Sequence, residues 1–177
     1  MKILKRILLV IVILIAILLV AALFISKEYS IEKEVTINKT KGEVFSYVKD
    51  FKNQDKYNIW VMKDPNARRS YRGTEGAVGY IASWDSDNSE VGKGEQEIKN
   101  IKEGERVDLQ VRFEKPFKNT ADVFMTTDAV AENVTKVKWG MAGRNSYPLN
   151  IMNLFIPGML GKDMETSLNN LKSVLEK

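Results

Sequence analysis

An apolar run near the N-terminus most constrains how this chain can fold. Residues 7–25 (ILLVIVILIAILLVAALFI) are 19 consecutive residues without a charged or strongly polar side chain. As an α-helix, such a run is roughly 28 Å long, which matches the hydrocarbon core of a bilayer. No face of this helix would be polar, so it does not suit a helix that covers a soluble core. The run therefore predicts a transmembrane helix over residues 7–26.

Charges on either side of the run predict its orientation. Lys2, Lys5 and Arg6 precede it, whereas Lys27 and Glu28 follow it and nearly cancel. Positive residues favour the cytoplasmic side of a membrane helix. We therefore expect a single-pass protein of the cytoplasmic (inner) membrane, with its N-terminus inside and its domain on the extracytoplasmic side.

A cleaved signal peptide is the alternative interpretation of this segment. Residues 20–22 (VAA) would pass as a small-residue cleavage site, but the apolar run continues beyond them. We favour an uncleaved signal-anchor for that reason. The chain then divides into a cytoplasmic basic flank at 1–6, a transmembrane helix at 7–26 and one domain at 27–177.

Composition excludes several classes of function. The first 27 residues hold four of the 27 basic residues and none of the 23 acidic ones, so the remainder has no net charge. Without a basic field, the domain is not expected to bind nucleic acid. The chain has no cysteine and no histidine. This excludes disulfides, cysteine nucleophiles, Cys/His zinc sites and histidine acid–base chemistry, and we expect neither a metal nor a cofactor.

Periodicity predicts an α+β domain. Residues 29–38 alternate as a strand does, and Thr40 with Glu43 forms a capping box that begins a short helix. A second short helix is expected near residues 51–57. From Ser70 to about residue 141, alternating segments separated by turns are typical of consecutive hairpins.

The end of the chain changes period. Residues 149–156 favour a helical piece, with Pro157 and Gly158 as a kink. A long amphipathic helix follows, because apolar residues recur at spacings of three and four: Leu160, Met164, Leu168, Leu171 and Leu175. An antiparallel sheet with one apolar face would bury this helix by curling around it.

This order resembles the SRPBCC superfamily, the START-like or birch-pollen-allergen-like helix-grip fold, and within it the polyketide cyclase/dehydrase and lipid-transport group. The likeness is carried by residues 31–60 (IEKEVTINKTKGEVFSYVKDFKNQDKYNIW), 73–84 (GTEGAVGYIASW), 92–107 (GKGEQEIKNIKEGERV) and 160–177 (LGKDMETSLNNLKSVLEK). It implies a seven-stranded antiparallel sheet around a C-terminal helix, with an apolar cavity between them. It does not imply a reaction, since the fold hosts carriers, sensors and enzymes.

The stretch VGKGEQE, residues 91–97, has three interpretations. A phosphate loop is disfavoured because Gly92 and Gly94 are not followed by Gly-Lys-Ser/Thr or by a helix. A catalytic carboxylate pair is disfavoured because Glu95 and Glu97 share one strand face with lysines, which is typical of a solvated surface. A twisted strand remains, whose glycines allow a bulge or a close approach.

Gln96 then faces inward, where its amide meets either neighbouring protein groups or a ligand's polar head. We predict a ligand cavity around it, because methionine and aromatic side chains suit an adaptable apolar site. A filled core is the alternative. Trp60 either rims the cavity or packs a helix onto the sheet. The predicted cavity residues are Trp60, Tyr80, Trp84, Gln96, Leu109, Val111, Phe113, Met125, Trp139, Met141, Met152, Phe155, Met159 and Met164.

Three functions stay open at this point. The first is a membrane-anchored module that binds a hydrophobic small molecule or lipid. The second is a cyclase or dehydratase, which needs an acid–base pair inside the cavity. Its candidates reduce to Tyr80, Gln96, Arg144 or an inward carboxylate, and the alternating strands supply no inward carboxylate. The third is a stress-linked or regulatory interaction module without a ligand.

Overall fold

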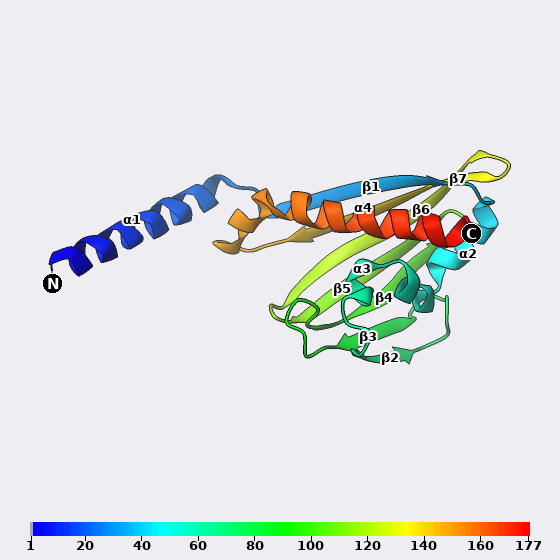
Figure 1. Ribbon diagram of the computed structural model, residues 1–177, viewed down its shortest axis with the longest axis horizontal. Helices are drawn as coiled ribbons and strands as arrows, with labels where there is room; N and C mark the ends of the chain where they lie inside the picture. The colour runs from blue at the N-terminus through cyan, green and yellow to red at the C-terminus, as the bar shows by residue number, and fades with distance from the viewer. Residues whose placement is uncertain (1) are drawn as a thin grey trace.

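The computed structural model describes residues 2–177 and confirms the expected helix-grip fold (Figure 1). The sheet has seven strands in the order β1-β7-β6-β5-β4-β3-β2, and all neighbouring strands are antiparallel. The elements are α1 (Lys2–Phe24), β1 (Glu28–Ile37), α2 (Lys41–Lys49), the 3₁₀ helix η1 (Phe51–Lys56), α3 (Ile59–Met62), β2 (Arg68–Arg72), β3 (Ile81–Asp85), β4 (Lys93–Lys102), β5 (Arg106–Lys115), β6 (Asn119–Ala131), β7 (Val134–Arg144), the 3₁₀ helix η2 (Leu149–Leu154) and α4 (Ile156–Leu175).

The long helix α4 packs against the curved sheet through its apolar stripe. Met164, Leu168 and Leu171 are almost completely buried, and on the sheet Ile37 and Val137 are buried with them. Each fully buried aliphatic side chain contributes about 1.5–3 kcal/mol relative to its exposed state. Because these residues recur every three or four positions in α4 and every second position in the strands, one core forms between helix and sheet.

The predicted capping box begins α2. The Thr40 hydroxyl accepts a hydrogen bond from the Glu43 backbone N–H, and the Glu43 carboxylate accepts one from the Thr40 N–H. The hydrogen bonds from the Thr40 hydroxyl and backbone hold the pKa of the Glu43 carboxyl below its usual value. The helix thus fixed buries Phe45 and Val48 and contacts β6, so it closes one end of the grip.

The antiparallel register gathers alternate strand ends at the opposite end of the grip. Glu28 opens β1 opposite Arg144, which closes β7, and Asn119 opens β6 next to the end of β5. Lys93 opens β4 next to Asp85, which closes β3. These residues define what we call the α1 end of the sheet, because β1 begins there directly after α1 (Figure 1).

Helix α1 is long and apolar enough to cross a membrane over Ile3–Phe24, with a mean hydropathy of 3.7. Only three residues separate Phe24 from the first residue of β1. In Figure 1 the helix projects away from the domain, and its final turn lies beside η2. This helix matches the apolar run from which the transmembrane segment was predicted.

The predicted kink at Pro157 and Gly158 is wrong. Pro157 lies in the first turn of α4, where a missing backbone N–H leaves no helical hydrogen bond unmade. The helical piece predicted over residues 149–156 exists separately as η2, which ends at Leu154. Pro157 therefore begins the long helix and does not bend it.

Candidate functional site

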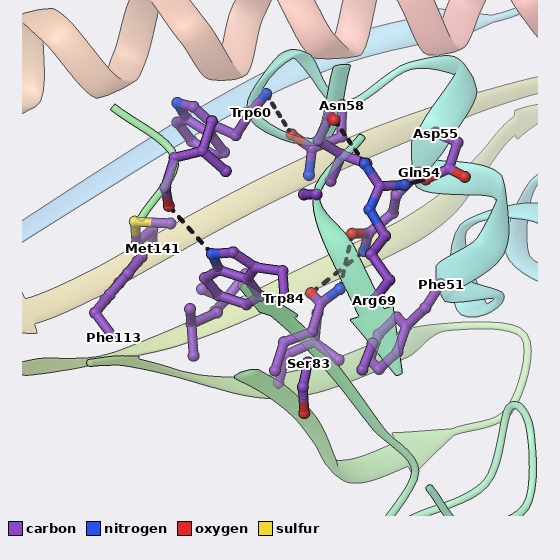
Figure 2. A pocket seen from close by; sticks show the side chains of 18 of the residues that line it. Phe51, Gln54, Asp55, Asn58, Trp60, Arg69, Ser83, Trp84, Phe113 and Met141 are labelled. Carbon is purple, nitrogen blue, oxygen red and sulfur yellow. Dashed lines mark hydrogen bonds and ion pairs between the residues drawn. The ribbon is translucent and has the colours of Figure 1, made fainter. Parts of the chain in front are cut away.

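A cavity of about 300 Å³ lies between the concave face of the sheet and the helices α3 and α4 (Figure 2). Apolar and aromatic side chains form most of its wall, and strands β3 to β7 contribute alternate residues to it. The following predicted residues line it: Trp60, Trp84, Gln96, Leu109, Val111, Phe113, Met125, Trp139 and Met141.

Two predicted residues lie in the packed core and not on the cavity wall. Tyr80 is buried between Phe51 and Tyr71, with ring centroids 5.4 and 6.1 Å away and nearly parallel planes. Met164 is fully buried among the core residues of α4. Both residues pack beneath the helices. Core residues and cavity residues follow the same strand and helix periodicity, so the sequence pattern alone could not distinguish them.

Three other predicted residues, Met152, Phe155 and Met159, do not face the cavity at all. They are exposed on the surface of η2 and the first turns of α4. The reason is that η2 turns Asn150 and Asn153 inward, toward the end of α1, so its apolar side chains point outward. Their predicted place on the cavity wall is therefore corrected.

The cavity occupies the half of the grip that is nearer to α1. Gln96 lies opposite Ala82 on β3 and Val111 on β5, and all three line the cavity. Trp84 and Phe113 lie still closer to the α1 end of the sheet. The other half is filled by fully buried side chains such as Val44, Ile98 and Val137.

Two residues of the stretch VGKGEQE, Val91 and Gln96, line this cavity. A side chain at Gly94 would lie 2.6 Å from the Trp84 ring and 2.5 Å from the Arg112 carbonyl oxygen, so only glycine lets the indole lie across the strand. The Trp84 Nε1–H donates to the Val91 carbonyl at 3.1 Å (Figure 2). A register shift between Lys93 and Gly94 confirms the predicted irregularity of this strand.

Glu95 and Glu97 lie on the outer face of the sheet, as predicted. Arg112 binds both, at 2.8 Å to Glu95 and 2.7 Å to Glu97, and Arg72 and Lys99 add further ion pairs. The hydrogen bond from Arg112 is the main reason why the pKa of the Glu97 carboxyl is below its usual value. These carboxylates form ion pairs on the outer face and do not line the cavity.

Gln96 pairs with Gln54 inside the grip. The Gln96 Nε2 donates to the Gln54 Oε1 at 2.8 Å, and the Gln54 Nε2 donates back to the Gln96 Oε1 at 3.4 Å (Figure 2). Both side chains line the cavity. Each amide keeps a free N–H and a free acceptor lone pair, so the pair can also bond to a polar group in the cavity.

We expect the substitution Gln96→Leu to destabilise the domain by about 1–3 kcal/mol, because it leaves the buried Gln54 amide without its partner. The double variant Gln54→Leu/Gln96→Leu is expected to cost less than the two single variants together. Urea denaturation of the full chain in detergent, followed by tryptophan fluorescence, measures both. Additive single and double effects would contradict the pairing.

Two tryptophans meet at the wall beneath α4. Trp60 and Trp139 pack edge to face at 5.6 Å, and the Trp60 Nε1–H donates to the Asp163 Oδ2 on α4 at 2.9 Å. Asn58 caps α3 by accepting the Trp60 N–H, which fixes the position of Trp60. Trp60 therefore both packs a helix and lines the cavity, so the two interpretations of this residue hold together.

The Trp139 indole carries an unsatisfied donor. Its Nε1 is buried and has no hydrogen-bond partner among the residues that the structure describes. An unpaired buried donor costs about 1–3 kcal/mol. The Trp139 ring lines the cavity, whereas its Nε1 is covered by protein atoms and does not face the cavity space.

Charged groups gather at the mouth of the cavity. Arg69 forms an ion pair with Asp55 and donates from Nη2 to the Val61 carbonyl at 2.8 Å (Figure 2). Glu90 forms an ion pair with Lys63 at 3.4 Å. The carboxylates of Asp55 and Glu90 are more than half exposed, so they lie at the rim and not inside the wall.

Tyrosines at the cavity are poor proton acceptors and remain phenols. Burial raises the pKa of Tyr29, Tyr57 and Tyr71, with Tyr57 the most strongly affected. All three line the cavity. Among residues 2–177, no carboxylate hydrogen-bonds to Tyr80 or Gln96, two of the candidates for acid–base chemistry. The third candidate, Arg144, is exposed and forms an ion pair with Glu28 at 3.9 Å.

Sequence reasoning missed several wall residues because they come from irregular segments. Gln54 and Asp55 belong to the 3₁₀ helix η1, and Asn58 to its connection with α3. Arg69 is the one inward-reaching arginine of β2, whereas Arg68 and Arg72 pair with Asp87 and Glu95 outside. Alternation within β2 could have separated Arg69 from its two neighbours.

A family model described as "Polyketide cyclase / dehydrase and lipid transport" matches residues 28–176. The chain belongs to this family. The match includes every strand and every helix except α1. The family and the cavity together support a domain that binds hydrophobic ligands.

Solved structures share the fold at low sequence identity. A protein from Thermobifida fusca is 14% identical, with a TM-score of 0.61, and the alignment covers 82% of this chain and 92% of that one. A protein from Chromobacterium violaceum is also 14% identical, with a TM-score of 0.60 and coverages of 84% and 97%. Ara h 8.0201 is 11% identical, with a TM-score of 0.56 and the same coverages. Comparison with curated proteins finds no significant match.

Proposed function

We propose that this family member is a membrane-anchored binding module that holds a hydrophobic small molecule or lipid. The observation that carries the proposal is the apolar cavity with the Gln54–Gln96 amide pair on its wall. Such a wall gives a ligand hydrophobic contact over most of its surface and a few polar groups that orient it. The ligand would thus be largely apolar and carry at least one hydrogen-bond acceptor.

The size of the cavity favours a compact occupant. Its volume of about 300 Å³ is at the lower end of the range for small-molecule sites. A small apolar molecule, or one acyl chain of a lipid whose polar head stays at the mouth, suits this space. Arg69 at the mouth would then lie close to the polar head.

A cyclase or dehydratase is supported less well by the same wall. General acid–base catalysis needs a group that changes protonation near neutral pH within reach of the reacting atoms. The tyrosines on the wall have raised pKa values, and Asp55 and Glu90 form ion pairs at the exposed rim. Binding without turnover therefore fits these groups better.

Mass spectrometry of the full chain tests the proposed binding. We would extract the protein with its surrounding lipids into polymer-bounded membrane discs, purify it and identify bound molecules in native and denaturing spectra. A stoichiometric apolar molecule is expected, and the double variant Gln54→Leu/Gln96→Leu should retain less of it, because the wall then has no amide for the ligand's polar group. A protein that is always empty would contradict the proposal and favour the interaction module; a chemically altered molecule would favour the enzyme.

We further propose that α1 anchors the domain with the N-terminus in the cytoplasm. The three N-terminal cations and the length of the apolar helix support this orientation. Protease added to intact spheroplasts should then degrade the domain. Protection until the membrane is permeabilised would contradict the orientation, and release of the domain as a soluble protein would favour a cleaved signal.

A further inference from the structure

The segment from Leu149 to Met159 buries its polar side chains and exposes its apolar ones, the reverse of a usual water-exposed surface. Asn150 is fully buried and Asn153 nearly so. Five large apolar side chains of the same segment are instead 48–64% exposed: Leu149, Met152, Leu154, Phe155 and Met159. We call these five residues the docking face.

Helical geometry places most of the docking face on one stripe. In a 3₁₀ helix, residues three apart lie above one another, so Leu149, Met152 and Phe155 are aligned along η2. Met159 follows Phe155 by four residues in α4 and so continues the stripe. The buried asparagines are three apart as well and form a separate stripe, about 120° around the helix from the first.

The buried asparagines explain why the segment is stable in this orientation. The Asn150 amide donates to the carbonyls of Ala22 and Ile25, and the Asn153 amide donates to that of Ser26. Asn145 in turn donates to the Asn153 Oδ1 at 2.7 Å. The polar side chains of the segment are thus used within the protein, which leaves an apolar surface outside.

The same hydrogen bonds set the height of the docking face relative to α1. Asn150 Nδ2 lies 2.6 Å from the Ala22 oxygen, so η2 lies beside the last turn of α1. Leu23 and Phe24 in that turn are exposed and apolar as well. Figure 1 shows the orange segment that leads into α4 near the end of α1, and η2 in this segment contacts α1. The docking face therefore lies at the level of the last turn of α1.

We propose that the docking face lies in the headgroup–acyl boundary of the bilayer that α1 spans, so that lipid covers it. The inference rests on the proposed anchor, because a bilayer around α1 reaches the level of its last turn. Exposed apolar patches of this kind mark interaction sites, and amphipathic helices bury such a face just below the headgroups. The docking face seats the domain on the membrane surface and fixes its orientation there.

Fluorescence quenching in vesicles tests this proposal, because the chain has no cysteine of its own. Single cysteines at Met152, Phe155, Leu14 and Val130 would carry an environment-sensitive fluorophore in the full chain. Leu14 lies within α1, and Val130 is an equally exposed apolar residue of β6 at the end of the sheet away from α1. The vesicles would contain phosphatidylcholine and phosphatidylglycerol with brominated acyl chains.

Quenching several-fold stronger at Met152 and Phe155 than at Val130, together with quenching at Leu14, is the expected result. Quenching at Leu14 alone would overturn the docking face and leave the anchor intact. Absence of quenching at Leu14 would overturn the anchor and the docking face together. A second copy of the chain could cover the docking face instead of lipid. In that case the fluorophore at position 155 would not be quenched by brominated lipid, and pyrene-labelled copies would form excimers. This result would also overturn the proposal.

A second variant makes part of the docking face polar at two residues that do not carry the fluorophore. In Leu154→Ser/Met159→Ser, quenching of the fluorophore at Met152 is expected to fall toward the Val130 level, while quenching at Leu14 stays unchanged. Both positions are exposed, so the substitutions spare the core. Unchanged quenching at Met152 in this variant would overturn the role of the docking face.

Discussion

The substitution Ala82→Phe is expected to reduce ligand retention by at least about tenfold, which corresponds to about 1.4 kcal/mol. Ala82 lines the cavity opposite Gln96, in the middle of the wall formed by β3 and β4. A phenyl ring at this position would occupy much of a space of about 300 Å³. The amount of apolar molecule that copurifies with the full chain, measured by mass spectrometry, gives the result directly.

Ala142→Phe is the matched control for this prediction. Ala142 belongs to β7 and is exposed on the outer face of the sheet, so the same chemical change occurs on the opposite side of the wall. It should leave ligand retention unchanged. Equal retention by wild type and Ala82→Phe, with both proteins folded by circular dichroism, would show that the ligand lies elsewhere.

The substitution Gly92→Ala is expected to lower the free energy of unfolding by about 3 kcal/mol or more, a large effect for one residue. Gly92 has a φ of +63°, and a methyl group on it would lie 2.2 Å from the Lys115 carbonyl oxygen. The left-handed conformation alone costs about 1–2 kcal/mol for a residue with a side chain. The backbone of the β5 end must move to remove the clash, and this adds the rest.

Gly104→Ala separates the two contributions. Gly104 has a φ of +72° but no atom within 4 Å of the added methyl group, so only the conformational cost applies. For a domain of this size, about 1 kcal/mol lowers the midpoint of thermal unfolding by about 2–4 °C. Thermal unfolding of both variants in the same detergent should show a clearly larger decrease for Gly92→Ala. Equal decreases would mean that the close contact with Lys115 does not determine the effect.

Periodicity made the fold predictable because one face of each element is buried. The alternation in β5 and β6 and the spacing of Met164, Leu168 and Leu171 in α4 follow directly from a sheet that packs on one helix. The same logic placed Leu109, Val111 and Met125 on the cavity wall. Core and cavity residues share this pattern, so the sequence could not show that Tyr80 and Met164 belong to the packed core.

The sequence was least informative about side-chain orientation where polar residues are buried and apolar residues are exposed. In η2 the asparagines point inward because they bind the carbonyl groups at the end of α1, a contact between residues more than 120 positions apart. A pattern analysis that assumes buried apolar side chains therefore turned Met152, Phe155 and Met159 the wrong way. The rim ion pair of Asp55 and Arg69 was missed for a similar reason, since it joins a 3₁₀ helix to an edge strand.

The short connection between α1 and β1 limits how far the domain, and the cavity inside it, can move from the membrane. Three extended residues span at most about 11 Å, and the hydrogen bond from Asn153 to the Ser26 carbonyl holds the connection against η2. In the proposed arrangement the domain cannot cross an aqueous compartment with its cargo, as a diffusing carrier does. The cavity instead stays at a fixed distance from the bilayer surface and binds its ligand there. A ligand must arrive from the adjacent leaflet or from a mobile donor, and long-distance transport would require that donor.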